Sequence, residues 1–479
     1  MKDGIEKQVS ALVALALVVV VAALLRGAVT ESAAAGADRA VAPSWAARVE
    51  SGLDHVAPEE LVDLVLEDPS QVGIVDLRPA DEFAALHLAG SVNLGLPQLL
   101  GPEGERLLSA WNGRTVVLVS NGMTHPAQAW TEFARRGRRD VRVLEDGLAG
   151  LSERELRPPT LRGVTGEHEA RHARYRWLAA RRALLGDGPS VPAHERYATD
   201  PERLEQPTLV SPRWLAARLD AVAVLDARSS AEAFAAGRLP GAQHVPVGRT
   251  RTTVAGVADE LLPAPDMARL LADLGLTPET AVVVYAEDRP QDATHLLVAL
   301  LSVGHTRVAL LEGGLPAWVA SGRALSTAPA PRAPAQYVPR PAPAGLAVLI
   351  DEVAQASAQG SSPIVDVRPR KSFRGEESTE ARAGHIPGAV NREYALDTVS
   401  VDGALYWKPR AELLAAYQGL GVEPASAPIV SCRTGHQASQ TWFTLRYLLG
   451  WERARWYDGS WKEWAARADL PAATGPGGA

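Results

Sequence analysis

The chain has 479 residues, 46% of them hydrophobic, and a net charge of −7 at neutral pH. This length accommodates three domains of ordinary size. The mild acidity lacks the basic footprint of a nucleic-acid-binding protein, and the single cysteine excludes an intramolecular disulfide framework. No cysteine–histidine cluster has the spacing of a metal site, so we expect neither a metal nor another cofactor.

The N-terminal region, residues 1–45, contains an uncharged and mostly apolar run of 17 residues from Val9 to Leu25. As a helix, this run would span roughly 25 Å, the short limit for crossing a bilayer. We expect it to anchor the chain in the membrane as an uncleaved signal, and the alternative is a signal peptide cleaved within residues 33–37. Either signal predicts that the body of the protein is periplasmic or otherwise extracytoplasmic.

Three later segments repeat the same order of features. In each, an apolar run predicts a buried strand that ends in an Asp-x-Arg sequence, beginning at Asp76, Asp226 and Asp366. A phenylalanine, a glycine turn, a second apolar strand and an Asp-Gly or Glu-Gly pair follow. The spacing of about 140 to 150 residues is that of a small domain rather than of a solenoid unit. The predicted domains are residues 46–157, 206–322 and 346–471.

Two linkers separate these copies. Residues 158–205 contain a charged helix on which His168 and His172 share a face. A metal site there lacks a third ligand, so a solvated helix face is the preferred interpretation. Residues 323–345 form a proline- and alanine-rich extended linker, and residues 472–479 a loose tail. Alternating strands and helices predict α/β domains with mostly parallel sheets.

Cys432 ends the second apolar strand of the third copy. A short polar loop follows, and residues 440–449 are predicted to be helical. Loop amides and the helix dipole favour a thiolate there, whereas an ordinary thiol, with a pKa near ~8.5, is mostly protonated. An inert core cysteine is the alternative, which this loop disfavours. The equivalent residues of the first two copies are Asn121 and Ala286, so only the third copy has a nucleophile.

Several of these motifs, in fixed order, resemble the rhodanese family of sulfurtransferases. They are the Asp-x-Arg strand, Gly-His-Ile-Pro-Gly-Ala-Val-Asn at 384–391, the cysteine loop and Tyr-Asp-Gly-Ser-Trp at 457–461. Residues 205–470 resemble tandem thiosulfate and 3-mercaptopyruvate sulfurtransferases, and residues 55–155 resemble a further copy more weakly. The resemblance implies three rhodanese-like domains, two of them inactive. It also implies transfer of sulfur from thiosulfate to cyanide or a thiol through a persulfide on Cys432.

The same resemblance suggests roles for the residues around Cys432. We expect the loop after the cysteine to bind the donor and to wrap its backbone amides around the sulfur. Trp461 either walls the pocket or packs in the core, and the loop histidine either moves a proton or has no role. The predicted loop residues are Arg433, Thr434, Gly435, His436 and Gln437, and the pair predicted to brace the loop is Asp366 and Arg368.

The Cys-Arg-x-Gly loop resembles the thiosulfate type rather than the mercaptopyruvate type, so thiosulfate is the favoured donor. Animal-type thiosulfate enzymes, however, have a lysine where Thr434 stands and an arginine where Ser372 stands. A phosphatase would need an arginine six residues after the cysteine, where Ala438 stands. The other alternative is a non-enzymatic persulfide carrier or scaffold in the cell envelope, whose inactive copies bind a protein partner.

Overall fold

The computed structural model describes residues 53–163, 166–186 and 197–476. No helix within these ranges is long and apolar enough to cross a membrane. The run from Val9 to Leu25, predicted as a membrane anchor, lies outside the described residues.

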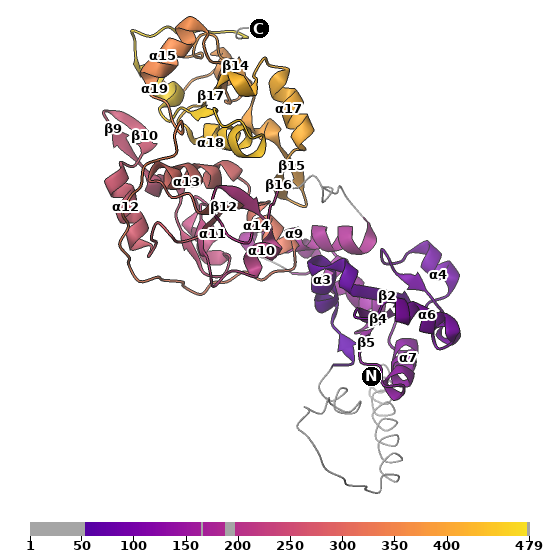
Figure 1. Ribbon diagram of the computed structural model, residues 1–479. Coiled ribbons are helices and arrows are strands. Elements are labelled where there is room, and N and C mark those ends of the chain that lie inside the picture. The colour runs from indigo at the N-terminus through magenta and orange to yellow at the C-terminus, as the bar shows by residue number, and fades with distance from the viewer. Residues whose placement is uncertain (1–52, 164–165, 187–196, 477–479) are drawn as a thin grey trace, which may run out of the picture. The chain divides into compact units, whose positions relative to one another are not determined.

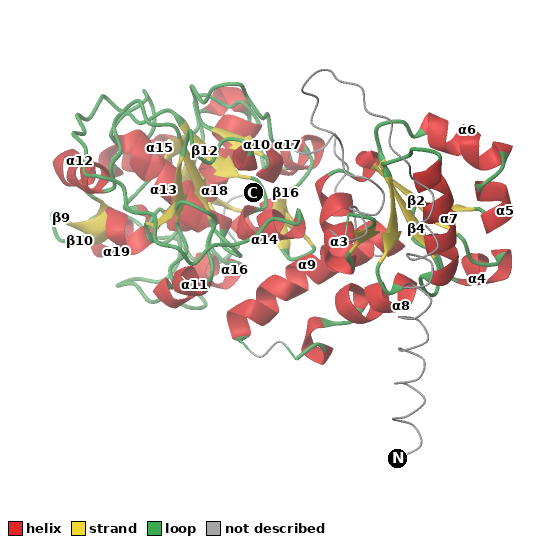
Figure 2. Cartoon of the chain, turned by 90° about the horizontal axis from the view of Figure 1, so that it is seen from below, coloured by secondary structure: helices red, strands yellow, loops and turns green. Residues whose placement is uncertain are grey.

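The first copy is an α/β domain around one parallel sheet with the strand order β1-β5-β4-β2-β3 (Figure 1). Alternate side chains of β4 enter two separate cores, Val117 on one face and Val116 on the other. Both faces are therefore covered by helices, as Figure 2 shows. The elements are β1 (His55–Val56), α3 (Pro58–Glu67), β2 (Val72–Asp76), α4 (Ala80–Ala85), β3 (Val92–Asn93), α5 (Leu96–Leu99), α6 (Pro102–Ala110), β4 (Thr115–Val119), α7 (Thr124–Arg135), β5 (Val141–Leu144) and α8 (Gly147–Leu151).

The second copy repeats this order as β6-β12-β11-β7-β8, again with parallel neighbours. An antiparallel hairpin, β9 with β10, is added after β8. The elements are β6 (Thr208–Val210), α10 (Pro212–Ala216), β7 (Ala223–Asp226), α11 (Ala231–Ala236), β8 (Ala242–His244), β9 (Arg251–Val254), β10 (Val257–Leu261), α12 (Ala264–Asp273), β11 (Val282–Tyr285), α13 (Pro290–Ser302), β12 (Val308–Leu311) and α14 (Gly314–Ala320).

The third copy has the order β14-β13-β17-β18, and a parallel bridge between Ala347 and Trp456 occupies the place of the fifth strand. It too carries an added hairpin, β15 with β16. The elements are α15 (Ile350–Gln359), β13 (Ile364–Asp366), α16 (Arg370–Arg374), β14 (Val390–Asn391), β15 (Thr398–Val401), β16 (Ala404–Trp407), α17 (Arg410–Gln418), β17 (Ile429–Ser431), α18 (His436–Phe443), β18 (Arg455–Trp456) and α19 (Ser460–Ala466).

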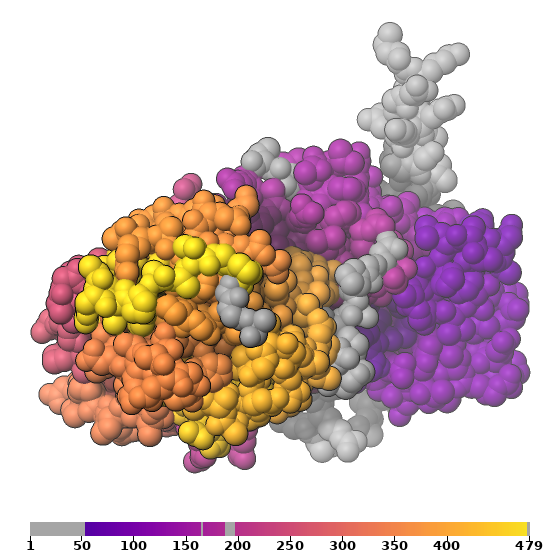
Figure 3. Space-filling model, turned by 90° about the horizontal axis from the view of Figure 1, so that it is seen from above, coloured from indigo at the N-terminus to yellow at the C-terminus, as the bar shows by residue number. Residues whose placement is uncertain are grey.

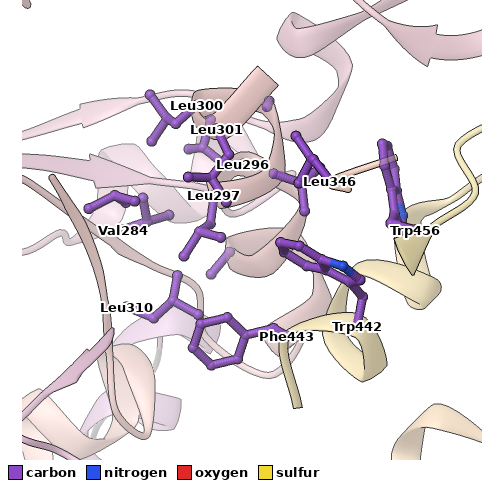
Figure 4. Close-up of a cluster of buried hydrophobic side chains, with 14 of the residues drawn as sticks. Val284, Leu296, Leu297, Leu300, Leu301, Leu310, Leu346, Trp442, Phe443 and Trp456 are labelled. Atoms are coloured by element: carbon purple, nitrogen blue, oxygen red, sulfur yellow. The ribbon is translucent and has the colours of Figure 1, made fainter. Parts of the chain in front are cut away.

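The second and third copies share one hydrophobic core. Helix α13 follows β11 as α18 follows β17, and the two equivalent helices pack against each other. Leu297 of α13 is fully buried in the same cluster as Trp442 and Phe443 of α18 (Figure 4). A hydrogen bond of 2.8 Å between the hydroxyls of Thr294 and Ser439 lies in the same contact. The helix behind the third copy's cysteine loop is thus held by the second copy.

Helix α9 (Glu167–Leu185), within the predicted linker, contributes to two cores. Its Tyr175 is buried in the second copy, and its Ala180 and Leu184 are buried in the first. At the other end of the chain, residues before 477 lie along the third copy (Figure 3), where Ala473 exchanges backbone hydrogen bonds with His385. The first residues of the predicted tail are therefore paired.

Candidate functional site

Cys432 lies at the carboxyl end of β17, which is a central strand because it pairs with both β13 and β18. The helix predicted for residues 440–449 begins earlier, at His436, and changes after Phe443 to a π-helical turn over residues 444–448. The loop is short because Gly435 turns the chain at φ 70°, next to the helix. A Cβ atom on Gly435 would lie 2.7 Å from Trp456 and 2.8 Å from the carbonyl oxygen of Asp458, so only glycine fits.

The cysteine is 1% exposed and contributes to the wall of a cavity of about 570 Å³. A thiol at the base of such a cavity is reached by a small donor and shielded from bulk solvent. Of the residues predicted to bind substrate, Arg433, Thr434, His436 and Gln437 line the cavity, while Gly435 shapes the turn beneath it. The other lining residues are Arg368, Pro369, Ser372, Glu377, Ser378, Thr379, Glu380 and Trp461.

Ser460 fixes the backbone of the loop. Its hydroxyl oxygen accepts hydrogen bonds of 3.1 Å from the amides of Cys432 and Gly435. The prediction that all loop amides surround the sulfur is therefore wrong for Gly435, whose amide is already bonded. The amides of Arg433, Thr434, His436 and Gln437 donate to no oxygen in the described part of the chain, so they are available to an anion.

The Asp-x-Arg pair lies beside the loop. Arg368 and Asp366 are buried and joined by a bidentate ion pair with a closest distance of 2.6 Å, and Arg368 also donates to the carbonyl of Gly384. Asp366 is in register with Ser431, and its neighbour Val367 donates to the Ser431 carbonyl. The same pair recurs in both copies that lack a cysteine, as Arg78 with Asp76 and Arg228 with Asp226. It therefore accompanies the fold and not the nucleophile, which fits a bracing role.

Trp461 has both of the roles that the sequence left open. It is 1% exposed within a core cluster, and it lines the cavity. The guanidinium of Arg368 lies 5.0 Å from the centre of its ring, a distance at which a cation is attracted to the aromatic face.

Arg433 lies at the mouth of the cavity, where the sequence did not predict a partner for it. Its guanidinium is 2.7 Å from the carboxylate of Glu380, so a negative charge from the same wall already balances it. Ser372, which stands where the resemblance expects an arginine, donates a hydrogen bond to Glu377. Arg433 and Ser372 are thus both bonded to glutamates from the segment after α16.

His436 reaches across to the second copy. Its Nε2 is 2.8 Å from the carboxylate of Asp292 on α13, and its ring lies edge-on to the fully buried His295. Burial lowers the pKa of His436 against the opposing attraction of Asp292, and burial also lowers the pKa of His295. Both imidazoles are therefore neutral at pH 7.

The hairpin β9–β10 of the second copy lies against the same loop. Arg251 donates to the carbonyl and hydroxyl oxygens of Thr434, Asp259 is 2.6 Å from Lys462, and the amide of Leu261 donates to Asp458. These contacts were not predicted from the sequence, where every residue expected at the site belongs to the third copy.

The equivalent sites of the other copies differ from each other. Asn121 of the first copy lies in a cavity of about 750 Å³ and donates to Glu82. In the second copy, the cavity beside Ala286 is only about 20 Å³, and the neighbouring Glu287 bonds to Arg228 and to Tyr175 from α9. Leu405 and Trp407 of β16 close this small cavity, and Tyr175 of the linker helix bonds to Glu287 in its wall, whereas the first copy's cavity is large.

In the part of the chain that the structure describes, no three His, Cys, Asp or Glu side chains converge as a metal site would require. His168 and His172 remain a pair on α9.

Comparison with known proteins identifies the family. The rhodanese-like domain model matches residues 57–154, 211–321 and 349–467. The chain is 32% identical to the sulfur carrier protein TtuD of Thermus thermophilus over 56% of this chain and 96% of that one. It is 33% identical to a thiosulfate sulfurtransferase of Corynebacterium glutamicum over 59% of this chain and 94% of the relative. It is 32% identical to that of Pseudomonas aeruginosa over 55% and 96%.

Among solved structures, wild-type EanB aligns with a TM-score of 0.49 at 20% identity, over 88% of this chain and 97% of that chain. The chain belongs to the rhodanese family and carries three rhodanese-like domains.

Glu260 of β10 and Asp458 face each other where the second copy meets the third, and they make stability depend on pH. Burial and the neighbouring Asp458 raise the pKa of Glu260 to about 8, and burial raises the pKa of Asp458 to about 6. Both shifts stabilise the protonated acids in the folded state, so the free energy of unfolding should fall as pH rises from about 4.5 to about 8.

Glu260→Gln removes one titratable carboxyl group, so the free energy of unfolding should depend less on pH. We expect the variant to gain about 1–2 kcal/mol relative to wild type between pH 5 and pH 8, after solvent screening of a partly exposed pair. Urea unfolding at the two pH values measures the change. Glu232→Gln, at an exposed position of α11, is the control and should follow wild type. A wild-type stability that rises over this pH range would contradict the prediction.

Proposed function

We propose that this rhodanese-family protein moves the outer sulfur of thiosulfate to a thiophilic acceptor, cyanide or a thiol, through a persulfide on Cys432. The observation that carries the proposal is the chain's single cysteine in the wall of a cavity, followed by a loop in which four amides have no acceptor in the described part of the chain. The thiosulfate sulfurtransferases among its relatives support the donor.

The reaction has two displacements. The Cys432 thiolate attacks the outer sulfur of thiosulfate, the sulfur–sulfur bond of the donor breaks, and its electron pair leaves with sulfite. The acceptor then attacks the terminal sulfur of the persulfide, and the thiolate is released. Neither step needs an oxidant or a metal. Both pass through an anionic sulfur that the amides of Arg433, Thr434, His436 and Gln437 are placed to stabilise.

Cys432→Ser should abolish sulfur transfer, since a hydroxyl forms no persulfide. Thiosulfate and cyanide are supplied, thiocyanate is measured, and mass spectrometry of the wild-type protein should show one added sulfur on the peptide that contains Cys432. Asn121→Ser, at the equivalent position of the first copy, is the matched control and should keep full turnover. Substantial thiocyanate formation by Cys432→Ser would sink the assignment.

We propose that the charge at the cavity mouth determines which sulfur donor the protein prefers. A guanidinium suits the doubly charged thiosulfate better than the monocarboxylate of 3-mercaptopyruvate, which is the alternative donor. Because Glu380 balances Arg433 at 2.7 Å, we expect the preference for thiosulfate to be moderate and its Michaelis constant to be high.

Arg433→Gly should lower kcat/KM for thiosulfate by a factor that corresponds to about 1.5–3 kcal/mol of lost transition-state stabilisation. It should lower kcat/KM for mercaptopyruvate by a smaller factor. Glu380→Gln is the opposite test. By freeing the guanidinium, it should raise kcat/KM for thiosulfate several-fold. Steady-state kinetics with both donors on the three proteins decides the matter. A wild-type preference for mercaptopyruvate, or equal losses for both donors in Arg433→Gly, would refute the claim.

A second candidate function is persulfide carriage to a protein partner. The similarity to the sulfur carrier protein TtuD favours it, and so does the open cavity of the first copy, which offers a binding surface without a nucleophile. In this alternative, Cys432 accepts sulfur but releases it to free cyanide or small thiols only slowly.

From the sequence alone, we propose that the apolar run from Val9 to Leu25 holds the body of the protein at the membrane, outside the cytoplasm. Fractionation should place the full-length chain in the membrane pellet after salt and carbonate washing, and protease added to spheroplasts should digest the body. A soluble chain that begins near residue 35 would instead establish cleavage of a signal peptide.

A further inference from the structure

A cationic side chain of the second copy lies behind the catalytic loop of the third. The guanidinium of Arg251, at the start of β9, donates to the carbonyl oxygen of Thr434 at 2.6 Å and to its hydroxyl oxygen at 3.2 Å. It also lies 3.1 Å from Nε2 and 3.5 Å from Nδ1 of His295. Burial lowers the pKa of His295, so this ring is neutral at pH 7 and adds no second positive charge.

These bonds fix one peptide unit from both sides. The carbonyl of Thr434 points to Arg251, and the amide of Gly435, in the same planar peptide, donates to Ser460 on the opposite side. The orientation of this peptide decides whether a carbonyl oxygen or amide hydrogens face the sulfur. Arg251 therefore keeps the oxygen away from the place where negative charge forms.

The charge of Arg251 lacks a close partner. Within the described residues no carboxylate lies at ion-pair distance from its guanidinium, although the side chain is partly buried. Burial lowers its pKa, and the negative charges that oppose this effect most are Asp458 and Cys432. Asp259 is paired with Lys462, and burial raises the pKa of Glu260 to about 8, so Glu260 is protonated at neutral pH. Asp458, whose pKa burial raises only to about 6, and a thiolate at Cys432 are the two negative charges that Arg251 faces most strongly.

We propose that Arg251 is a positioning residue through which the second, cysteine-less copy keeps the sulfur of Cys432 in its anionic, reactive form. It does so by orienting the Thr434 peptide and by placing a positive charge behind the loop. Thr434 stands where the resemblance expects a lysine, and it carries no charge. Arg251 supplies a positive charge there from a different domain. The inference rests on the proposed function only in taking Cys432 as the nucleophile.

The test is the alkylation of Cys432 by iodoacetamide as a function of pH, in the full-length protein. Because the chain has one cysteine, every alkylation event reports on this sulfur. The other charged or titratable groups near the loop are present in every variant, namely Arg368, Arg433, His436, Asp458 and Lys462 of the third copy and Asp259, Glu260 and Asp292 of the second.

Arg251→Gln should raise the pH of half-maximal alkylation by about one to two units, the size of effect that a nearby opposite charge has on an ionisable group. Arg251→Lys should shift it by less than half as much, because it keeps the charge. Arg249→Gln, at an exposed neighbouring position whose side chain donates to the His244 carbonyl, should match wild type. Thermal unfolding of each variant confirms folding, and Arg251→Met replaces Arg251→Gln if that variant does not fold.

The inference is overturned if the neutral variant is folded and its alkylation midpoint stays within about 0.2 units of wild type, or if Arg251→Lys shifts as far as Arg251→Gln. The second result would mean that the fit of the side chain, and not its charge, matters. Alkylation needs no sulfur donor. A shifted midpoint in a protein that never forms thiocyanate would therefore support Arg251 and reject the proposed transfer reaction, and normal turnover with an unshifted midpoint would do the reverse.

Discussion

The packing of α13 against α18 is the contact on which the geometry of the Cys432 loop depends. Each helix follows the strand and loop that would hold a nucleophile in its own copy, and their buried faces share one hydrophobic core. Leu297, Trp442 and Phe443 in this contact are fully buried, and removing a large side chain from such a core typically costs about 3–5 kcal/mol. The contact therefore sets the position of the helix N-terminus behind Cys432, and with it the directions of the loop amides.

The three copies share one sheet order and one buried ion pair, and they differ in the loops that follow their strands. The buried Asp-x-Arg pair is present in all three, at 2.7, 2.6 and 2.6 Å. In each copy its arginine also ties the end of the strand to a backbone carbonyl further along the chain, that of Leu86, Gly237 or Gly384. The cysteine position, by contrast, holds Asn121 in the first copy and Ala286 in the second. Beside Ala286, Leu405 and Trp407 of β16 close the cavity, and Tyr175 of α9 bonds to Glu287 in its wall. The apolar surface buried at this contact stabilises the pair of domains.

The sequence predicted the repeats, the parallel sheets, the linker helix and the place of Cys432 at the end of a strand, because these follow from local signals: apolar runs, glycine turns and the register to the Asp-Gly pair. It did not predict the partners of the loop. Arg251, Asp292 and Glu260 are 181, 140 and 172 residues before Cys432 in the chain, and nothing in their local sequence marks them as contacts of the loop. Glu380 was missed for another reason, since Arg433 looked sufficient as a donor contact until its partner was in view.

The second copy lacks a cysteine, but it contributes a charged side chain to the Cys432 loop of the third copy. The arginines in the cavity wall are already paired, Arg368 with Asp366 and Arg433 with Glu380, so neither adds much net field at the sulfur. Arg251 lacks such a pairing in the described part of the chain, and it enters from a hairpin added after β8. An anionic intermediate in a cavity of low dielectric needs a charge that is fixed in advance of the reaction. A rigid neighbouring domain can hold such a charge against the loop without exposing it to solvent, and this is a physical reason for keeping an inactive copy fused to an active one.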